Sequence, residues 1–403
     1  MSWGFVASGL CKFNQLSISN QAQKSIQKKI YAYFYLKCLW QTRRSILKNR
    51  LIGENNKNQR NMKRTLNYLL TIPALFALAI TISCEGPEGP VGQDGQNASE
   101  VCKECHNDEK QDSVSTQYAS SVHAAGANVG YAGGRNDCAA CHSHEGFVET
   151  QHTGRDTTAA DIPIPTAIAC NTCHDDHNTL DFENDGPDYA MRTKEAVTLL
   201  MDGSSLDFEG SSNLCASCHQ PRTPAPSSTD GTYAITSPHY GPHHGTQATV
   251  LEGIGGYELA GSMSYPEPGA STHRTGASCN SCHMSPAADN NSTGGHTFVP
   301  NLASCTSCHT DASSFDVNGV QTEVESMLGD LETALINANI IGTDGHLLDD
   351  SGEALNYGSS LNLTIDQAGA YFNWATVAED RSMGVHNPAY VKALLQNSIE
   401  VFN

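Results

Sequence analysis

Three stretches near the C-terminal end of the chain repeat apolar residues at the spacing of an amphipathic helix. The first stretch has its apolar residues at Val320, Val324, Met327, Leu328, Leu331, Leu335 and Ala338. The second stretch runs from Ile365 through Tyr371, Phe372 and Trp374 to Val377. The third opens at Asn387-Pro388, a cap residue followed by a first-turn proline, and continues through Tyr390, Val391, Leu394, Leu395 and Ile399. The pattern predicts a C-terminal helical cap over residues 311–403.

Residues 98–310 show no comparable apolar periodicity. They are rich in Gly, Ser, Thr, Asn and Asp, which favour turns and irregular segments. A stretch of this composition cannot bury a large aliphatic core. We therefore expect short helices, irregular connections and a core that is supplied by something other than aliphatic side chains.

Twelve of the chain's 15 cysteines lie in this stretch as six CxxC pairs, and a histidine follows each pair directly. The motifs are Cys102–Cys105–His106, Cys138–Cys141–His142, Cys170–Cys173–His174, Cys215–Cys218–His219, Cys279–Cys282–His283 and Cys305–Cys308–His309. CxxCH indicates a covalently attached c-type haem, whose iron the histidine ligates. Zinc ribbons also use CxxC pairs, but they do not need a histidine after every pair. The sequence predicts six haems c that form the core.

The start of the chain carries a predicted targeting region. Residues 62–84 combine a basic start, a short apolar run and Ser83-Cys84, as in a lipoprotein signal peptide with Cys84 as the lipidated residue. Residues 1–61 precede this signal and indicate an extension from a start codon assigned too early. Residues 85–97 are rich in glycine and proline and predict a tether.

The charge of the chain limits its partners. Acidic residues outnumber basic ones by 43 to 23, for a formal net charge of −20. Residues 1–61 contain nearly half of the basic residues and a single acid, Glu54, so the remainder is more acidic still. Such a surface is unsuited to nucleic acid. It favours basic or metallic partners.

The remaining histidines suggest how each iron is completed. Of 17 histidines, six belong to the motifs and 11 remain. Low-spin haems that transfer electrons need a second strong axial ligand. Only four of the eight methionines lie in the haem region, against nine of the remaining histidines, so histidine is favoured on both sides of each iron.

Several stretches resemble the multihaem c-type cytochromes of extracellular electron transfer, which include hexahaem outer-membrane cytochromes that polymerise into filaments. They are Ser120–His123, Cys138–Phe147, Ser237–Gln247 with Gly255–Glu258, and Cys279–Met284 with Gly294–Phe298. Asp380–Pro388 is also similar to the closing helix of multihaem nitrite and hydroxylamine enzymes. The resemblance implies a multihaem cytochrome fold, mostly irregular with short helices and a haem-packed core, followed by the C-terminal helices.

The resemblance also implies distal ligands. The histidines that it assigns to this role are His123, His239, His243, His296 and His386. His177, three residues after a motif histidine, completes the expected set of six. His152, His244 and His273 are reserves, whereas His144 and His346 are expected at the surface.

Two functions remain open for such a chain. The first is an exported electron carrier at the outer membrane or cell surface, which passes electrons to other redox proteins or extracellular acceptors and can polymerise. The second is a multihaem reductase of a small nitrogen or sulfur oxyanion. Reductases of the nitrite type carry a CxxCK motif, which this sequence lacks, so the carrier is favoured.

The lipid-anchor prediction can be tested at Cys84. Replacing the acylated cysteine removes the attachment point, so Cys84→Ser should move the protein from the membrane fraction to the soluble fraction. Ser99→Ala, a small change beyond the signal and the tether that keeps Cys84, should leave the distribution unchanged. Retention of the Cys84→Ser protein in the membrane fraction would refute lipidation at this residue.

Overall fold

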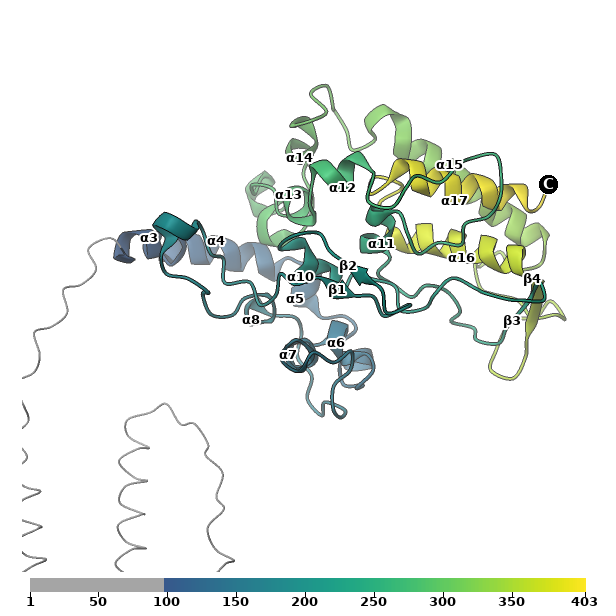
Figure 1. Ribbon diagram of the computed structural model, residues 1–403, viewed down its shortest axis with the longest axis horizontal. Helices are drawn as coiled ribbons and strands as arrows, with labels where there is room; N and C mark the ends of the chain where they lie inside the picture. The colour runs from purple at the N-terminus through teal and green to yellow at the C-terminus, as the bar shows by residue number, and fades with distance from the viewer. Residues whose placement is uncertain (1–97) are drawn as a thin grey trace, which may run out of the picture. The chain divides into compact units, whose positions relative to one another are not determined.

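The computed structural model describes residues 98–403 (Figure 1). The predicted extension (1–61), signal peptide (62–84, with Cys84) and tether (85–97) lie outside the described residues. Within residues 98–403, no helix is both long enough and apolar enough to cross a membrane.

The part of the chain with the CxxCH motifs consists of short helices joined by irregular segments. Its α-helices are α3 (Ala98–Cys105), α4 (Asp108–Ala119), α5 (Val122–Ala125), α6 (Ala139–His142), α7 (His144–Thr153), α8 (Cys170–Cys173), α9 (Phe182–Asp185), α10 (Ser212–Ala216), α11 (Gln247–Glu252), α12 (Thr272–Gly276), α13 (Cys279–His283) and α14 (Leu302–Thr306). Single turns of other helix types are η1 (Val129–Gly133), η2 (Asp289–Asn291) and η3 (Gly295–Thr297). The predicted fold class is confirmed.

Polar side chains start several of these short helices. The Asn107 side chain accepts a hydrogen bond from Lys110 N at 2.8 Å at the start of α4. Ser143 does the same for Gly146 N at 3.2 Å, at the start of α7. Such caps satisfy backbone N–H groups that a helix leaves free, so a polar sequence can still nucleate helical turns.

Two small antiparallel sheets complete the elements. Strand β1 (Val197–Thr198) pairs with β2 (Ser205–Leu206). Strand β3 (Thr232–Ile235) pairs with β4 (Leu361–Thr364), so that Thr232 lies opposite Thr364 and Ile235 opposite Leu361. The second sheet thus ties the segment after the fourth motif to the C-terminal helices.

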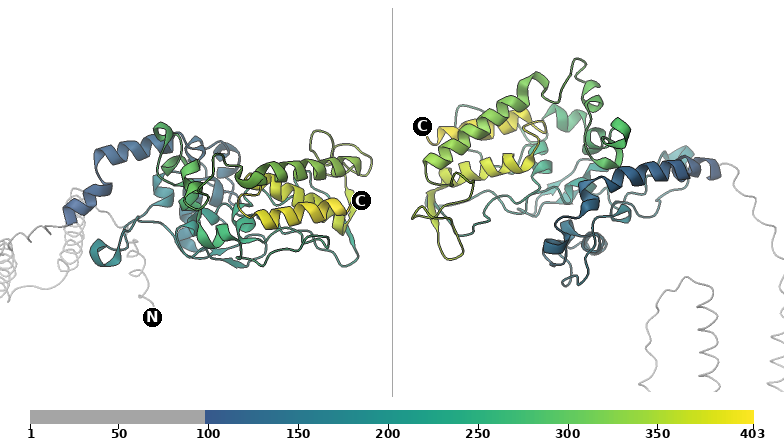
Figure 2. Two further views of the ribbon diagram at one scale, coloured as in Figure 1. Left: turned by 90° about the horizontal axis from the view of Figure 1, so that it is seen from above. Right: turned by 180° about the vertical axis from the view of Figure 1, so that it is seen from behind.

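Three longer helices form the C-terminal region and lie side by side (Figures 1 and 2). They are α15 (Val320–Asn337), which follows η4 (Val317–Gly319), α16 (Ile365–Asp380) and α17 (Pro388–Glu400). All three agree with the periodicity in the sequence. Asn387 caps α17 as expected, accepting from Tyr390 N at 3.2 Å, with Pro388 in the first turn.

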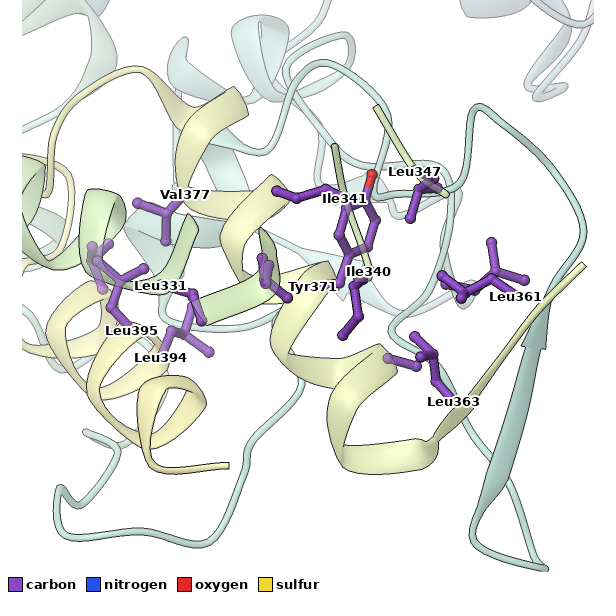
Figure 3. Packing of buried hydrophobic residues seen from close by; sticks show 14 of the residues in the cluster. Leu331, Ile340, Ile341, Leu347, Leu361, Leu363, Tyr371, Val377, Leu394 and Leu395 are labelled. Carbon is purple, nitrogen blue, oxygen red and sulfur yellow. The ribbon is translucent and has the colours of Figure 1, made fainter. Parts of the chain in front are cut away.

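The helices α15, α16 and α17 enclose a continuous apolar core (Figure 3). Leu331, Leu335 and Leu394 are fully buried in it. The core also takes in Ile235 and Val250, from the segment between the fourth and fifth motifs. The helical region is therefore packed together with part of the preceding chain.

Buried amides fasten that preceding segment to α16 and α17. Asn373 in α16 accepts from Tyr257 N at 2.7 Å and donates to Tyr257 O at 2.8 Å. Asn397 in α17 accepts from Met263 N at 3.0 Å. At Gly369 a Cβ would lie 2.1 Å from the Tyr257 ring, so the close approach of this segment to α16 requires glycine.

The apolar core should dominate the stability of the C-terminal region. Leu331→Ala removes a fully buried side chain and should lower the free energy of unfolding by about 2–5 kcal/mol, measured by denaturation followed by circular dichroism. Leu180→Ala is the control, because Leu180 is 72% exposed and its loss should change stability by less than about 0.5 kcal/mol. Equal effects of the two changes would contradict this account of the core.

Candidate haem-binding sites

Each CxxCH motif forms a helical turn closed by its own backbone. His106 N donates to Cys102 O at 2.8 Å, and His219 N donates to Cys215 O at 2.9 Å. Residues three and four apart lie on the same side of such a turn. The turn therefore presents two thiols and one imidazole on one face, as attachment and ligation of a haem require.

Every motif histidine faces a second histidine from elsewhere in the chain. The facing pairs, with the distances between ring centroids, are His106 with His177 at 6.0 Å, His142 with His243 at 6.2 Å, His174 with His296 at 6.2 Å, His219 with His123 at 6.1 Å, His283 with His386 at 6.4 Å and His309 with His273 at 6.1 Å. The narrow range of the six distances indicates one common cause.

The pair geometry fits a metal ion held between two imidazoles. Two metal–nitrogen bonds of about 2 Å each, added to the distances from the nitrogens to the ring centres, span about 6 Å. The twelve cysteines of residues 98–403 form no disulfides, so their thiols are free to attach a cofactor. The paired histidines and the motif thiols together match the donor set of a c-type haem with histidine on both sides of the iron.

Five of the six predicted distal histidines lie opposite a motif histidine: His123, His177, His243, His296 and His386. His239 does not. It is exposed, and its ring centroid lies 6.3 Å from Tyr357. The neighbouring Tyr240 stacks on Tyr371 of α16 and thereby draws this segment toward the helical core.

His273 lies opposite His309, the remaining motif histidine, and so takes the place in the set of six that was predicted for His239. It lies on α12, and its Nδ1 is held by Val385 O at 2.5 Å. The sequence marked His273 only as a reserve, because no local pattern shows that α12 packs beside the sixth motif. The fold brings the rings of His273 and His309 to 6.1 Å from each other, although the two residues are far apart in the sequence.

The other histidines make different contacts. His144 Nδ1 lies 2.8 Å from Thr172 Oγ1, and the residue is half-buried rather than at the surface as predicted. His244 Nδ1 lies 2.8 Å from a carboxylate oxygen of Glu379. His152 and His346 are exposed.

Neutral oxygen acceptors orient several of the paired rings. These contacts join His174 Nδ1 to Tyr189 O at 2.7 Å, His283 Nδ1 to Phe298 O at 3.0 Å and His219 Nδ1 to Gln247 Oε1 at 3.1 Å. An oxygen of this kind only accepts, so Nδ1 carries the proton and Nε2 is left free. A metal-ligating histidine usually has this arrangement, in which one ring nitrogen donates to an oxygen and the other is free for the metal ion.

Burial keeps several of the paired imidazoles neutral. It lowers the pKa of His123 to about 4, with a further contribution from His219, and the pKa of His243 to about 4, with a contribution from Arg222. The neutral imidazole is the form that binds a metal ion, so no proton has to be displaced at pH 7.

Three of the motifs lie close together, with the fourth next to the second and the fifth. Cys141 Sγ lies 3.8 Å from Ser217 O, while Cys218 Sγ lies 3.8 Å from Ala140 O, so the second and fourth motifs are packed together. The fourth and fifth are joined through Ser212, whose Oγ accepts from Cys279 N at 3.2 Å. The attachment points of these three sites therefore form one group.

Two families match separate parts of the chain. Residues 81–233 match the family described as outer membrane cytochrome MtrC/MtrF-like, domains II/IV. Residues 269–402 match the cytochrome c552 family. Both matches agree with the CxxCH motifs, and together they span all six.

Curated relatives include two C-type polyheme cytochromes of Geobacter sulfurreducens. OmcB is 26% identical over 340 residues, covering 67% of this chain and 44% of its own length. OmcC is 26% identical over 283 residues, covering 58% of this chain and 36% of its own length. The chain therefore spans less than half the length of the curated relatives that it matches.

Two solved structures show a distant likeness. The outer cell wall cytochrome OcwA has a TM-score of 0.44 at 18% identity, covering 72% of this chain and 50% of that one. The undecaheme cytochrome from the S-layer of Carboxydothermus ferrireducens has a TM-score of 0.37 at 19% identity, covering 66% and 37%.

The pairing geometry distinguishes His273 from His239 as a ligand. His273→Ala removes the imidazole that faces His309, so one haem should become high-spin in the absorption and electron paramagnetic resonance spectra, while covalent haem attachment stays complete. His239→Ala is the matched control and should leave every haem low-spin. The opposite result, with high-spin iron only in His239→Ala, would show that the pairing is wrong.

Proposed function

We propose that this chain, a multihaem c-type cytochrome related to the cytochromes of extracellular electron transfer, binds six haems and carries electrons between them. The observation that carries the proposal is the set of six facing histidine pairs, each with one CxxCH histidine. The ligands proposed for each iron are the two members of its pair, and the proposed attachment points are the two cysteines of its motif.

The residues of the chain have two tasks in this function: they attach each haem and they hold its iron. The haem iron supplies the one-electron chemistry. The motif cysteines anchor each group, and the paired histidines hold it from both sides in the neutral form that binds iron. Because electron transfer makes and breaks no bonds, the chain needs no mobile acid, base or substrate pocket beside these groups.

The close packing of motifs supports transfer along the chain. The second, fourth and fifth motifs adjoin one another through Cys141, Cys218, Ser212 and Cys279. Groups attached at adjoining turns lie near one another, which favours direct transfer between them. The fourth motif, between the other two, is the proposed junction.

The geometry argues against the reductase. Reduction of an oxyanion requires an iron with an open coordination position, where the substrate binds. All six motif histidines face a second histidine, so every iron would have two protein ligands. A carrier is therefore the function that the arrangement supports best.

The proposed location is the outer membrane or cell surface. Three features support it: the predicted signal and lipidated Cys84, the extracytoplasmic attachment of c-type haem, and the matching family named for outer-membrane cytochromes. The proposed partners are other redox proteins or extracellular acceptors, which an acidic surface would meet through basic or metallic groups. Assembly into a homopolymer is a further proposal that follows from the resemblance.

The proposal of six haems with two histidine ligands each predicts the haem content and the spin state of the protein. The purified protein should show six haems in a pyridine haemochrome assay and a matching excess in intact mass. The iron should be low-spin at neutral pH, and the reduced protein should bind carbon monoxide poorly, because no coordination position is open. Four haems or fewer in matured protein would contradict the count. Rapid carbon monoxide binding would instead favour the reductase.

A further inference from the structure

A tight turn between α16 and α17 places His386 against the end of α16. Arg381, Met383 and Gly384 adopt left-handed backbone conformations, with φ of 60°, 49° and 85°. Space also requires glycine at 384, because a Cβ there would lie 2.8 Å from Val324 on α15. The turn is therefore strained but well defined, and it folds His386 back over Asp380.

Asp380 is a buried carboxylate in contact with this histidine. Its Oδ1 lies 2.6 Å from His386 Nδ1, while its other oxygen accepts from the Ser382 hydroxyl. The residue is 1% exposed. A buried carboxylate is costly unless it is paired, and the imidazole N–H and the hydroxyl supply its partners here.

No other histidine of the six pairs has a carboxylate at hydrogen-bond distance in residues 98–403. The acceptors at His174, His219, His273 and His283 are neutral backbone or amide oxygens. The nearest comparable carboxylate is that of Asp188, 3.9 Å from His177 Nδ1, which is too far for a hydrogen bond.

The electrostatics of His386 differ accordingly. Burial lowers the pKa of His123, His142 and His243. Burial also acts on His386, but the charge of Asp380 and its hydrogen bond outweigh it and raise the pKa of His386 above its ordinary value. The contact between Asp380 Oδ1 and His386 Nδ1 therefore sets this imidazole apart from those held by neutral oxygens.

We propose that Asp380 is a positioning residue that makes His386 a stronger electron donor and lowers the reduction potential of the haem attached at Cys279 and Cys282. The proposal rests on the proposed ligation of that iron by His283 and His386. A carboxylate that accepts the Nδ1 proton fixes the tautomer and raises the basicity of Nε2. A basic ligand and a nearby buried negative charge both favour the ferric state, so both lower the potential.

Gln247 of α11 is a neutral acceptor for another paired histidine, and it contacts the same end of α16. Its side-chain N–H donates to Glu379 O at 2.8 Å, one residue from Asp380, while its Oε1 lies 3.1 Å from His219 Nδ1. The end of α16 thus supports an amide acceptor at the fourth site and a carboxylate at the fifth. The paired histidines of two neighbouring sites therefore have acceptors of different charge, a neutral amide at His219 and a carboxylate at His386.

The test is a redox titration of the full haem-loaded protein, followed by its absorption spectrum. Asp380→Asn keeps the shape and an oxygen acceptor but removes the charge, so one of the six midpoint potentials should shift to a more positive value while all haems stay low-spin. Asp188→Asn is the matched control: it removes a carboxylate beside His177 that makes no hydrogen bond to Nδ1, and it should shift the potentials less.

A second variant covers the case in which Asp380→Asn fails to fold. Ser382→Ala removes a hydrogen-bond donor to Asp380 and leaves its carboxylate a stronger acceptor for His386. One potential should then shift in the opposite direction, to a more negative value. If Asp380 had only a structural role, Ser382→Ala would leave all the potentials unchanged, and that result would overturn the proposal without reference to Asp380→Asn.

The outcomes separate this proposal from the proposed function. Unchanged potentials in Asp380→Asn, together with one high-spin haem in His386→Ala, would overturn the role of Asp380 and leave the carrier and its ligands intact. If His386→Ala leaves six low-spin haems, His386 is not a ligand, and both the pairing and the present proposal are overturned. Opposite shifts in the two variants support it.

Discussion

Six pairs of imidazoles held about 6 Å apart are the constraint on which the first two thirds of the described structure depend. The rings of each pair are too far apart to bond to each other, and burial lowers the pKa of several of them, including His123 and His243. Apart from the helical core, the main apolar cluster is small and centres on Val197, Leu199 and Leu206. Haems between the paired rings would supply the core that the apolar side chains do not provide, and they would cross-link segments far apart in the sequence. Haem binding and folding would then be one process.

The helical region has a different physical basis. Leu331, Leu335 and Leu394 are buried without any need for a cofactor, and buried amides such as Asn373 and Asn397 fasten the preceding segment to the helices. This region can therefore act as a rigid support. Rigidity matters because a metal ligand binds best when its position is set by the fold before the metal ion arrives.

The sequence predicted what is local and left open what is long-range. CxxCH spacing predicted six attachment sites, and apolar periodicity located α15, α16 and α17. Choosing His239 over His273 failed to match the structure, because the choice depends on which segment packs beside the sixth motif, and Tyr240 draws its neighbour toward the helical core instead. The contact between Asp380 and His386 could not be predicted either, because their hydrogen bond depends on a turn with three residues in left-handed backbone conformations.

The turn after α16 shows why a helical region without a haem motif matters to the haem sites. Three of the paired histidines depend on it: His386 lies in the turn, His273 donates to Val385 O, and His219 donates to Gln247, whose side chain in turn donates to Glu379 O. The fourth, fifth and sixth sites thus share a support of fewer than ten residues. The three histidines have a carboxylate, a backbone carbonyl and an amide as their acceptors. Histidines with such different acceptors would differ in basicity, so three neighbouring irons could differ in potential although all have histidine ligands. A chain with only CxxCH motifs and histidines would lack this means of ordering its potentials.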